Sequence, residues 1–414
     1  MLPPSSTHLA EFEISSRNGF LPDQPPLQKL DDTYYASWEA IIGDLPGLLN
    51  SSSLRNEVDH LPILSTSRLR SEREWQRAYL ILSFVTHAYI WEAPGPSERL
   101  PPSISVPFLK VSSHLQLPPT ATYAALSLWN FKSSNTDCDL SRIEDLQVLH
   151  TFTGTQDEEW FYLISVAIEA QGAEAIPLML NAIDAVESDN SPMVIAALKE
   201  FSYLIRKISL LLKRMHEKCS PEIFYNEIRP YFAGSKNMGL AGLPNGVFYD
   251  EGEGNGQWQQ YSGGSNAQSS LIQFFDIVLG VEHFDVKGTK GSKHGFLRQM
   301  RSYMPGPHCS FLEHLESIAN IRAYAEQTAV PEVTEAYNFA VKELESFRDI
   351  HIQIVARYII MPSRQHVSTG HRGVNLAIAS ANPDVRKDLH GTGGTELMPF
   401  LRQSRDETRA AALS

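Results

Sequence analysis

The chain has 414 residues and a formal charge of −13, because 48 Asp and Glu outnumber 35 Lys and Arg. This charge, without a cluster of basic residues, does not fit a general nucleic-acid binder, since phosphate contacts need grouped Lys and Arg. Three widely spaced cysteines, Cys138, Cys219 and Cys309, form no C-x-x-C pair and predict neither a disulfide framework nor a structural zinc site.

The N-terminus and the apolar runs predict a cytoplasmic protein. The first residues, MLPPSSTHLAEF, lack the basic and apolar regions of a secretory signal. The most apolar run, residues 79–91, is shorter than the roughly 20 residues that a bilayer span needs, and it contains Ser83, Thr86 and His87. We therefore expect no membrane partner. The isolated cysteines fit a reducing compartment.

Residues 1–150 predict a small, mostly helical N-terminal domain, as the length of the chain favours two domains. Helical spacing recurs in residues 31–49 and 71–91, and Pro94 closes the second segment. The prolines in residues 101–119 predict a mainly extended or turning segment. A short helix over residues 121–131, which contains Tyr123, precedes a polar stretch and a domain boundary near residue 150.

Residues 151–414 predict a large helical domain. Helical patterns fill residues 157–170, 173–186 and 191–218, and Ser191 with Pro192 forms a cap and first-turn pair for the third. The glycine-rich residues 233–270 have little periodicity and predict a long loop, which is usually functional or disordered. Few strand-like alternations occur beyond residue 150, so the predicted fold class is mainly α.

The longest predicted helix lies between Pro331 and Pro362. Because proline is tolerated at a helix start but not inside a helix, these residues bracket an uninterrupted helix of roughly 30 residues. His351 lies in its apolar stripe. A buried imidazole needs partners, so this position predicts either a core histidine bonded to a carbonyl or an axial haem ligand facing an apolar cavity. The polar residues from about 362 to 394 predict a mobile lid.

Four motifs give the chain a family resemblance. The runs RAYLILSFVTHAYIW, RSYMPGPH, FRDIHIQIVARYIIMP and GTGGTELMPFLRQ closely resemble the indoleamine 2,3-dioxygenase family, and the resemblance covers nearly the whole chain. It implies haem b, with His351 as the proximal ligand to the iron. It also implies L-tryptophan or another indoleamine and dioxygen as substrates, and an electron donor that keeps the haem ferrous. No protein acid or base is expected to act in catalysis.

The implied reaction opens the indole ring of L-tryptophan to give N-formylkynurenine. This is the first step of the kynurenine pathway, which serves tryptophan catabolism and NAD synthesis, and we expect a monomeric enzyme. An alternative is a catalytically weak haem protein of the same fold that binds or senses small ligands.

The resemblance also assigns substrate contacts. Arg229 matches the residue that binds the amino-acid carboxylate, and Phe224 matches the aromatic residue that packs on the indole. Tyr225 stands where relatives often have a second Phe. Ser165 and Tyr123 match residues of the distal haem pocket. From the residues alone, Arg229 fits a solvent-exposed arginine, Ser165 a serine bonded to its own helix, and Tyr123 ordinary packing between domains.

Further matches lie near the expected haem. Gly264 and Ser265 match a loop over the haem edge, and Thr392 of the GTGGT signature would lie near the polar end of the substrate or a haem propionate. Arg348 is expected to pair with Asp276 beside the haem, although such pairs are commonly just solvated.

Three rival sites have weaker support. Residues 263–267, GGSNA, approximate the G-x-S-x-G elbow of hydrolases, but the polar residues before the serine do not predict a buried strand. His216 and Cys219 lie one helical turn apart yet lack further metal ligands. The glycine run at residues 252–256 lacks the strand and helix that flank a dinucleotide-binding fingerprint.

Overall fold

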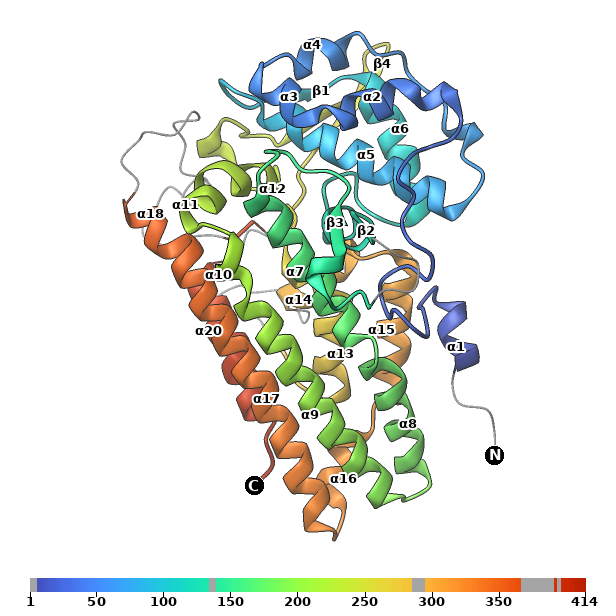
Figure 1. Cartoon of the computed structure of the whole chain (residues 1–414), viewed down its shortest axis with the longest axis vertical. Coiled ribbons are helices and arrows are strands. Elements are labelled where there is room, and N and C mark those ends of the chain that lie inside the picture. Colours follow the sequence, from blue (N-terminus) through green and yellow to red (C-terminus); the bar gives the residue numbers. More distant parts are fainter. Residues whose placement is uncertain (1–5, 134–138, 285–294, 366–390, 393–395) are drawn as a thin grey trace.

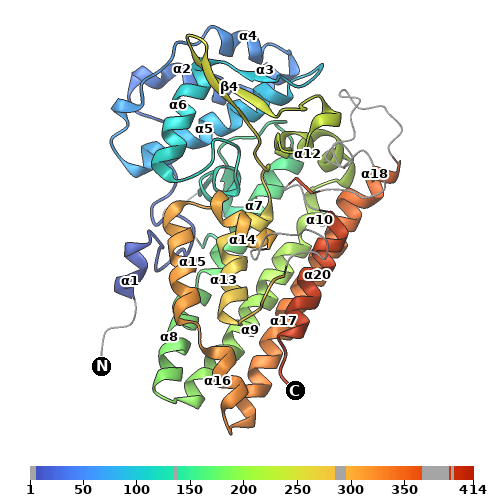
Figure 2. The same ribbon diagram turned by 180° about the vertical axis from the view of Figure 1, so that it is seen from behind.

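The computed structural model describes residues 6–133, 139–284, 295–365, 391–392 and 396–414. Within these residues the chain is mainly α-helical with short strands, as the sequence predicts (Figure 1). Helices from the first part of the chain gather at one end of the molecule, above a group of long helices that run along its length (Figure 2). The domain boundary near residue 150 stays a prediction.

α5 (Glu72–Trp91) is the central helix of the N-terminal group. Ser71 caps it, since its hydroxyl accepts a hydrogen bond from the Glu74 N–H while the Glu74 carboxylate accepts one from the Ser71 N–H. Every residue from Arg77 to Trp91 is buried, because shorter helices surround α5. These are α2 (Ala36–Gly43), α3 (Leu45–Asn50), α4 (Leu54–Asp59) and α6 (Pro102–Leu115), and α1 (Ser6–Glu11) lies apart from them.

α6 shows that the prediction of a mainly extended segment over residues 101–119 is wrong. Pro102 occupies the first turn, where its missing N–H costs nothing, whereas Pro107 lies inside the helix. Packing against α5 outweighs the hydrogen bond that Pro107 cannot donate. The buried apolar residues follow helical spacing: Ile104, Phe108, Val111 and Leu115.

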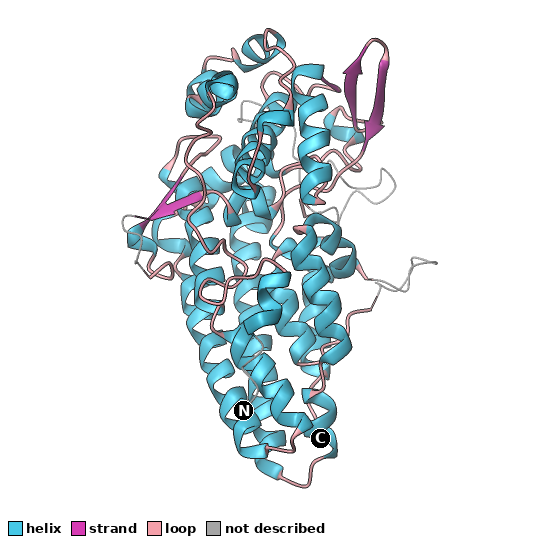
Figure 3. Ribbon diagram, turned by 90° about the vertical axis from the view of Figure 1, so that its right-hand side faces the viewer, coloured by secondary structure: helices cyan, strands magenta, loops and turns pink. Residues whose placement is uncertain are grey.

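The glycine-rich segment is only partly a loop, because it contains the hairpin of β4 (Val247–Gly252) and β5 (Asn255–Gln259) (Figure 3). β4 also pairs in parallel with β1 (Arg99–Leu100), which places the hairpin beside the N-terminal helices. The positive φ angles of Gly252, Gly254 and Gly256 shape this hairpin and its turn. A second, two-stranded sheet joins β2 (Phe131–Ser133) and β3 (Leu146–Val148).

The long helices pack around α9 (Ser191–Lys213), which contacts α7 (Gln156–Gly172), α8 (Ala175–Glu187) and α17 (Pro331–Val355). The cap of α9 is Asn190 rather than Ser191, since the Asn190 side chain accepts the Met193 N–H at 3.2 Å. The helix ends at Lys213, before α10 (Met215–Lys218), and not at residue 218. The remaining longer helices are α13 (Ser270–Val278), α15 (Gly306–Ile318), α16 (Ile321–Gln327) and α20 (Leu397–Ala410).

α17 begins at Pro331 as predicted, but it is not one uninterrupted α-helix up to Pro362. A π-helical segment, η9 (Ala356–Ile360), follows it, and α18 (Met361–Gln365) continues past Pro362. Pro362 is tolerated because it lies in the first turn of α18. Residues 362–365 of the predicted lid are therefore helical. Residues 366–390 and 393–395 of it lie outside the described residues.

One described segment, Gln156–Glu187, is long and apolar enough to pass as a membrane span. However, 72% of its most apolar part is buried inside the protein, which is typical of a core helix.

Candidate active site

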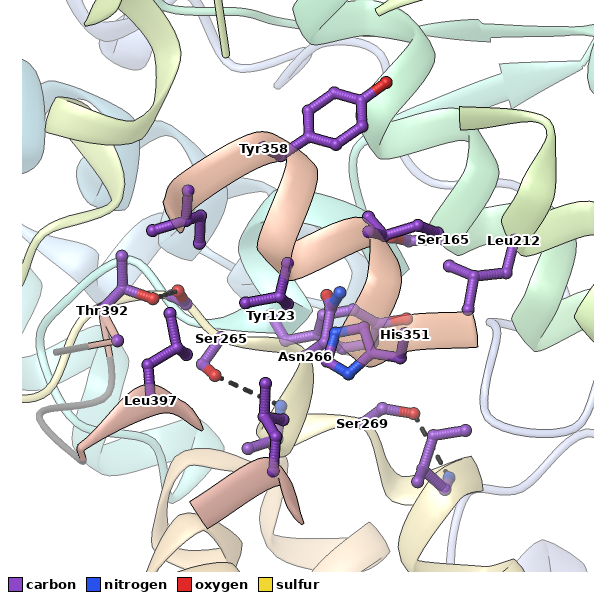
Figure 4. A pocket seen from close by; sticks show the side chains of 18 of the residues that line it. Tyr123, Ser165, Leu212, Ser265, Asn266, Ser269, His351, Tyr358, Thr392 and Leu397 are labelled. Carbon is purple, nitrogen blue, oxygen red and sulfur yellow. Dashed lines mark hydrogen bonds between the residues drawn. The ribbon is translucent and has the colours of Figure 1, made fainter. Parts of the chain in front are cut away.

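A cavity of about 250 Å³ lies where α7, α17 and α20 meet the segments around residues 123–128, 224–232 and 264–272 (Figure 4). Its walls are mainly apolar, with side chains such as Ile168, Leu212 and Phe347. The structure brings every site residue named from the sequence to this cavity. They are Tyr123, Ser165, Phe224, Arg229, Gly264, Ser265, Arg348, His351 and Thr392. Their individual roles stay predictions.

Three π-helical segments of the described chain border the cavity. They are η3 (Ala124–Leu128), η5 (Phe224–Ile228) and η9. A π-helical turn holds an extra residue and so redirects side chains, and such turns are frequent at functional sites. Phe224 begins η5, and Arg229 directly follows its end. This irregular backbone therefore presents both predicted substrate contacts to one cavity.

The imidazole of His351 faces the cavity from α17 (Figure 4). Among the described residues, neither ring nitrogen has a hydrogen-bond partner. Burial, reinforced by the nearby positive charge of Arg348, lowers the pKa of His351 to about 4. The ring is therefore neutral near pH 7, and a nitrogen lone pair is available to a ligand in the cavity.

Arg229 is not the solvent-exposed arginine that its sequence context alone favours, because only 4% of it is exposed. Burial lowers the pKa of Arg229, which reflects the cost of a cation in apolar surroundings. The guanidinium carbon lies 5.7 Å from the centre of the Tyr225 ring. Phe224 is held by other rings, at 5.0 Å from Phe161 and 5.7 Å from Tyr358 between ring centres. A cation and an aromatic face thus border the same space.

A buried carboxyl group, Glu169 of α7, lies behind the wall formed by Tyr123. The Tyr123 hydroxyl donates to Glu169 Oε1 at 3.0 Å, and the Ser269 hydroxyl donates to the same oxygen at 2.6 Å. Burial raises the pKa of Glu169 to about 7. One turn earlier, the Ser165 hydroxyl makes a long hydrogen bond of 3.5 Å to the Phe161 carbonyl of its own helix, and it also interacts with the Tyr123 hydroxyl.

Thr392 is bonded to the loop of residues 263–265, beside Ser265 at the cavity (Figure 4). Its hydroxyl donates to the Gly264 carbonyl at 2.7 Å, and its own carbonyl accepts the Gly263 N–H at 3.0 Å. A Cβ atom on Gly263 would lie 1.9 Å from the Phe232 carbonyl oxygen, so this close approach requires glycine. The GTGGT signature thus contributes Thr392 to the cavity wall.

Arg348 pairs with Asp276, as the sequence predicts, through contacts of 2.6 and 2.7 Å. It also donates to the Ser404 hydroxyl at 2.8 Å. Burial alone would raise the pKa of Asp276, but Arg348 and His283 outweigh it and hold that pKa below its usual range. This pair is buried, so it is not merely a solvated surface contact.

The chain matches the sequence model of the family described as indoleamine 2,3-dioxygenase over residues 8–411. It belongs to the indoleamine 2,3-dioxygenase family. Its chemistry is therefore that of an oxidoreductase that uses dioxygen.

Named relatives span nearly the whole chain. An indoleamine 2,3-dioxygenase of Penicillium citrinum is 43% identical over 409 residues, covering 97% of this chain and 88% of that protein. The indoleamine 2,3-dioxygenase of Saccharomyces cerevisiae is 42% identical over 426 residues, with 98% and 93% covered. A 6-hydroxytryptophan 2,3-dioxygenase of Fusarium equiseti is 38% identical over 402 residues, with 97% of both chains covered.

Indoleamine 2,3-dioxygenases depend on haem, and the groups at this cavity fit that cofactor. A haem site requires a neutral nitrogen ligand within largely apolar walls, which His351 and the cavity provide. The buried Nε of Arg348 also has no hydrogen-bond partner among the described residues. Its N–H therefore offers a donor for an acidic group bound in the cavity.

The rival sites find no support in the described chain. Ser265 follows a loop rather than a strand, and its hydroxyl accepts the Ala267 N–H, as in a helix cap. His216 Nδ1 lies 3.1 Å from the Tyr358 hydroxyl, and no group of three or more His, Cys, Asp or Glu is placed to hold a metal ion within the described residues. The glycine run forms the β4–β5 hairpin instead of a dinucleotide-binding turn.

Several polar groups at this site were not identified from the sequence, among them Glu169 and Asn266. Glu169 follows Ser165 by four residues in the largely apolar stretch 160–170 of α7, and this spacing was a signal that both lie on one face. Asn266 lines the cavity next to Ser265, with a side-chain amide that makes no hydrogen bond to another described residue. Its position directly after the GGS motif of residues 263–265 was the available signal.

Proposed function

We propose that this protein is a haem-dependent dioxygenase that converts L-tryptophan and dioxygen into N-formylkynurenine. The observation that carries the proposal is the shared cavity of His351, Arg229 and Phe224. It combines a neutral nitrogen ligand, a buried cation and an aromatic face, which suit a haem, an amino-acid carboxylate and an indole ring. Family membership supports the dioxygenase chemistry.

Each residue has a definite role in this proposal. His351 holds the haem through a ring nitrogen, and its neutral form is maintained by burial. Arg229 binds the substrate carboxylate by charge-assisted hydrogen bonds, which are stronger in a water-poor cavity. Phe224 packs on the indole and, with Arg229, orients its C2–C3 bond. Arg348 offers its unpaired N–H to a haem propionate.

Bound haem supplies the ferrous iron at which dioxygen reacts. In the overall reaction the indole C2–C3 bond breaks, and one oxygen atom enters the formyl group while the other enters the ketone. No atom is lost from either substrate, so the scheme assigns no proton transfer to a protein acid or base. The apolar walls exclude water that would compete at the reacting carbons.

We also propose the cellular setting of this reaction. The enzyme would act as a cytoplasmic monomer at the entry to the kynurenine pathway, with a cellular electron donor that keeps the haem ferrous. Residues 1–150 would form a domain that covers the distal side of the haem pocket. The name of the Fusarium relative supports including ring-hydroxylated tryptophan among the substrates to be compared.

The test is a reaction of the haem-loaded enzyme with L-tryptophan under ¹⁸O₂, followed by mass spectrometry of the product. The proposal predicts N-formylkynurenine that carries two ¹⁸O atoms from one O₂ molecule. A haem-containing protein that binds tryptophan but forms no labelled product would favour the alternative of a ligand-binding or sensing protein.

A further inference from the structure

His87, in the penultimate turn of α5, joins two segments that form the cavity walls although it does not line the cavity itself. Its Nε2 accepts the Ala121 N–H at 3.0 Å and lies 2.8 Å from the Thr120 hydroxyl oxygen. Its Nδ1 lies 2.7 Å from the carbonyl oxygen of Tyr231. One ring therefore connects the segment before Tyr123 with the segment after Arg229.

The hydrogen bonds fix the tautomer of His87. A backbone N–H can only donate, so Nε2 is unprotonated and Nδ1 carries the proton that is donated to the Tyr231 carbonyl. Burial lowers the pKa of His87 to about 4, so this neutral form persists at physiological pH. Both ring nitrogens are thus used, one as a donor and one as an acceptor.

Arg229 needs such an external constraint, because the backbone that carries it is short and irregular. It lies at the start of α12 (Arg229–Phe232), a four-residue helix that directly follows the π-helical η5. Helices this short do not fix their own geometry. α5, by contrast, has 20 residues and a capping box.

A second donor from α5 reaches the same backbone. Trp91, one turn after His87, donates its Nε1–H to the Ala233 carbonyl at 2.8 Å. The carbonyls of Tyr231 and Ala233 are therefore both bound to one long, rigid helix.

We propose that His87 is a positioning residue that sets the place of Arg229 relative to the wall formed by Tyr123, and so sets the affinity for the substrate carboxylate. This inference rests on the proposed function, in which Arg229 binds that carboxylate. His87 touches neither substrate nor cofactor, and it acts through the Tyr231 carbonyl and the Ala121 N–H. Trp91 supports it from the same helix.

Two substitutions test the hydrogen bonds of His87 to Tyr231 and to Ala121 separately. His87→Gln keeps an acceptor near the Nε2 position for Ala121 but loses the donor to Tyr231. His87→Asn keeps a donor near the Nδ1 position but loses the acceptor. Equilibrium binding of L-tryptophan and of tryptamine, which lacks the carboxylate, is measured on the haem-loaded protein from the change in the Soret band.

His87→Gln should weaken tryptophan binding by roughly fivefold to tenfold, the effect of one hydrogen bond, with tryptamine binding within about twofold of wild type. His87→Asn should lower the ratio of the two affinities less than His87→Gln does, because the donor that holds the Arg229 segment to α5 is kept while the contact to Ala121 is lost. In an Arg229→Leu background, His87→Gln should have no further effect on tryptophan binding, because the group that it positions is gone.

The control is Tyr35→Phe, which removes a part-buried hydrogen bond of 2.7 Å from a buried side chain to the Ser65 carbonyl and should lower stability without changing the affinity ratio. If His87→Gln does not fold, Trp91→Phe replaces it and should show the same selective loss. Equal weakening of both ligands, no weakening, or an undiminished effect in the Arg229→Leu background would overturn the inference. If Arg229→Leu alone leaves the ratio unchanged, the carboxylate contact of the proposed function fails instead.

Discussion

One guanidinium nitrogen of Arg348 lies 2.6 and 2.7 Å from the two carboxylate oxygens of Asp276, one helical turn from His351. Asp276 in turn contacts His283 at 3.0 Å, and His283 contacts Glu407 at 2.7 Å. Charges of opposite sign thus alternate through the protein behind the cavity. They link α17, α13 and α20, so the helix that carries His351 is fixed by ionic contacts as well as by apolar packing.

Asp276→Asn should strongly destabilise the protein. The substitution leaves Arg348 buried without its counter-ion, which typically costs about 3–5 kcal/mol. Urea unfolding should show this loss of free energy. The control is Asp349→Asn, which breaks a 3.0 Å contact with Arg405 where the Asp349 side chain is 43% exposed, and should change the free energy by less than about 1 kcal/mol. Equal losses of unfolding free energy in the two variants would show that Asp276 is not an essential buried counter-ion of Arg348.

The His283 contacts predict a loss of stability at alkaline pH. Burial alone would lower the pKa of His283, but Asp276 and Glu407 outweigh it and raise it to about 9, above the 6.5 of an unfolded chain. A raised pKa contributes stability that is complete below about pH 6.5 and is lost as the pH rises to about 9, by roughly 3 kcal/mol. Urea midpoints across this range should fall in wild type and stay flatter in His283→Gln. A parallel fall in both would refute the prediction.

Gly263→Ala should damage the cavity wall. The added Cβ would lie 1.9 Å from the Phe232 carbonyl oxygen, so backbone must move, at a cost of about 3 kcal/mol. We expect a lower melting temperature and weaker tryptophan binding, because the Thr392 contacts depend on this loop. Gly95→Ala is the control, since a Cβ there meets nothing within 4 Å. A Gly263→Ala protein with normal stability and binding would show that the loop is not tightly held.

Arg229→Leu should weaken the binding of L-tryptophan by roughly 10- to 100-fold, because hydrogen bonds to a charged group contribute about 1.5–3 kcal/mol. Tryptamine binding should change little. The side chain is 4% exposed, so leucine also removes the cost of a buried cation and should keep the protein folded. Arg229→Lys tests whether charge alone suffices. An unchanged affinity for L-tryptophan in Arg229→Leu would show that Arg229 does not bind the substrate carboxylate.

The sequence predicted the elements in which local pattern and packing agree. α5 was predicted from helical spacing and the closing Pro94, the start of α17 from Pro331, and the mainly α fold from helical spacing. α6 was missed because apolar contacts with α5 override the effect of Pro107. The β4–β5 hairpin was missed because its pairing with β1 joins residues that are far apart in the chain.

The nine predicted residues all line the cavity. They were predicted from the family resemblance and not from their spacing in the sequence. The long-range contacts of Glu169 and of His283 have no local signal in the sequence. Glu169 is buried against Ser269, and His283 against Glu407, which are 100 and 124 residues away in the chain. The interruption of the helix after Val355 by η9 also has no simple sequence signal.

The most direct test compares wild type with His351→Ala after expression with ample haem. The visible spectrum of the reduced protein with carbon monoxide measures bound haem, and absorbance after addition of L-tryptophan and oxygen measures N-formylkynurenine. We expect haem and product for wild type, and loss of haem or of turnover for His351→Ala. Normal haem content with full activity in the variant, or no haem in wild type, would contradict this expectation.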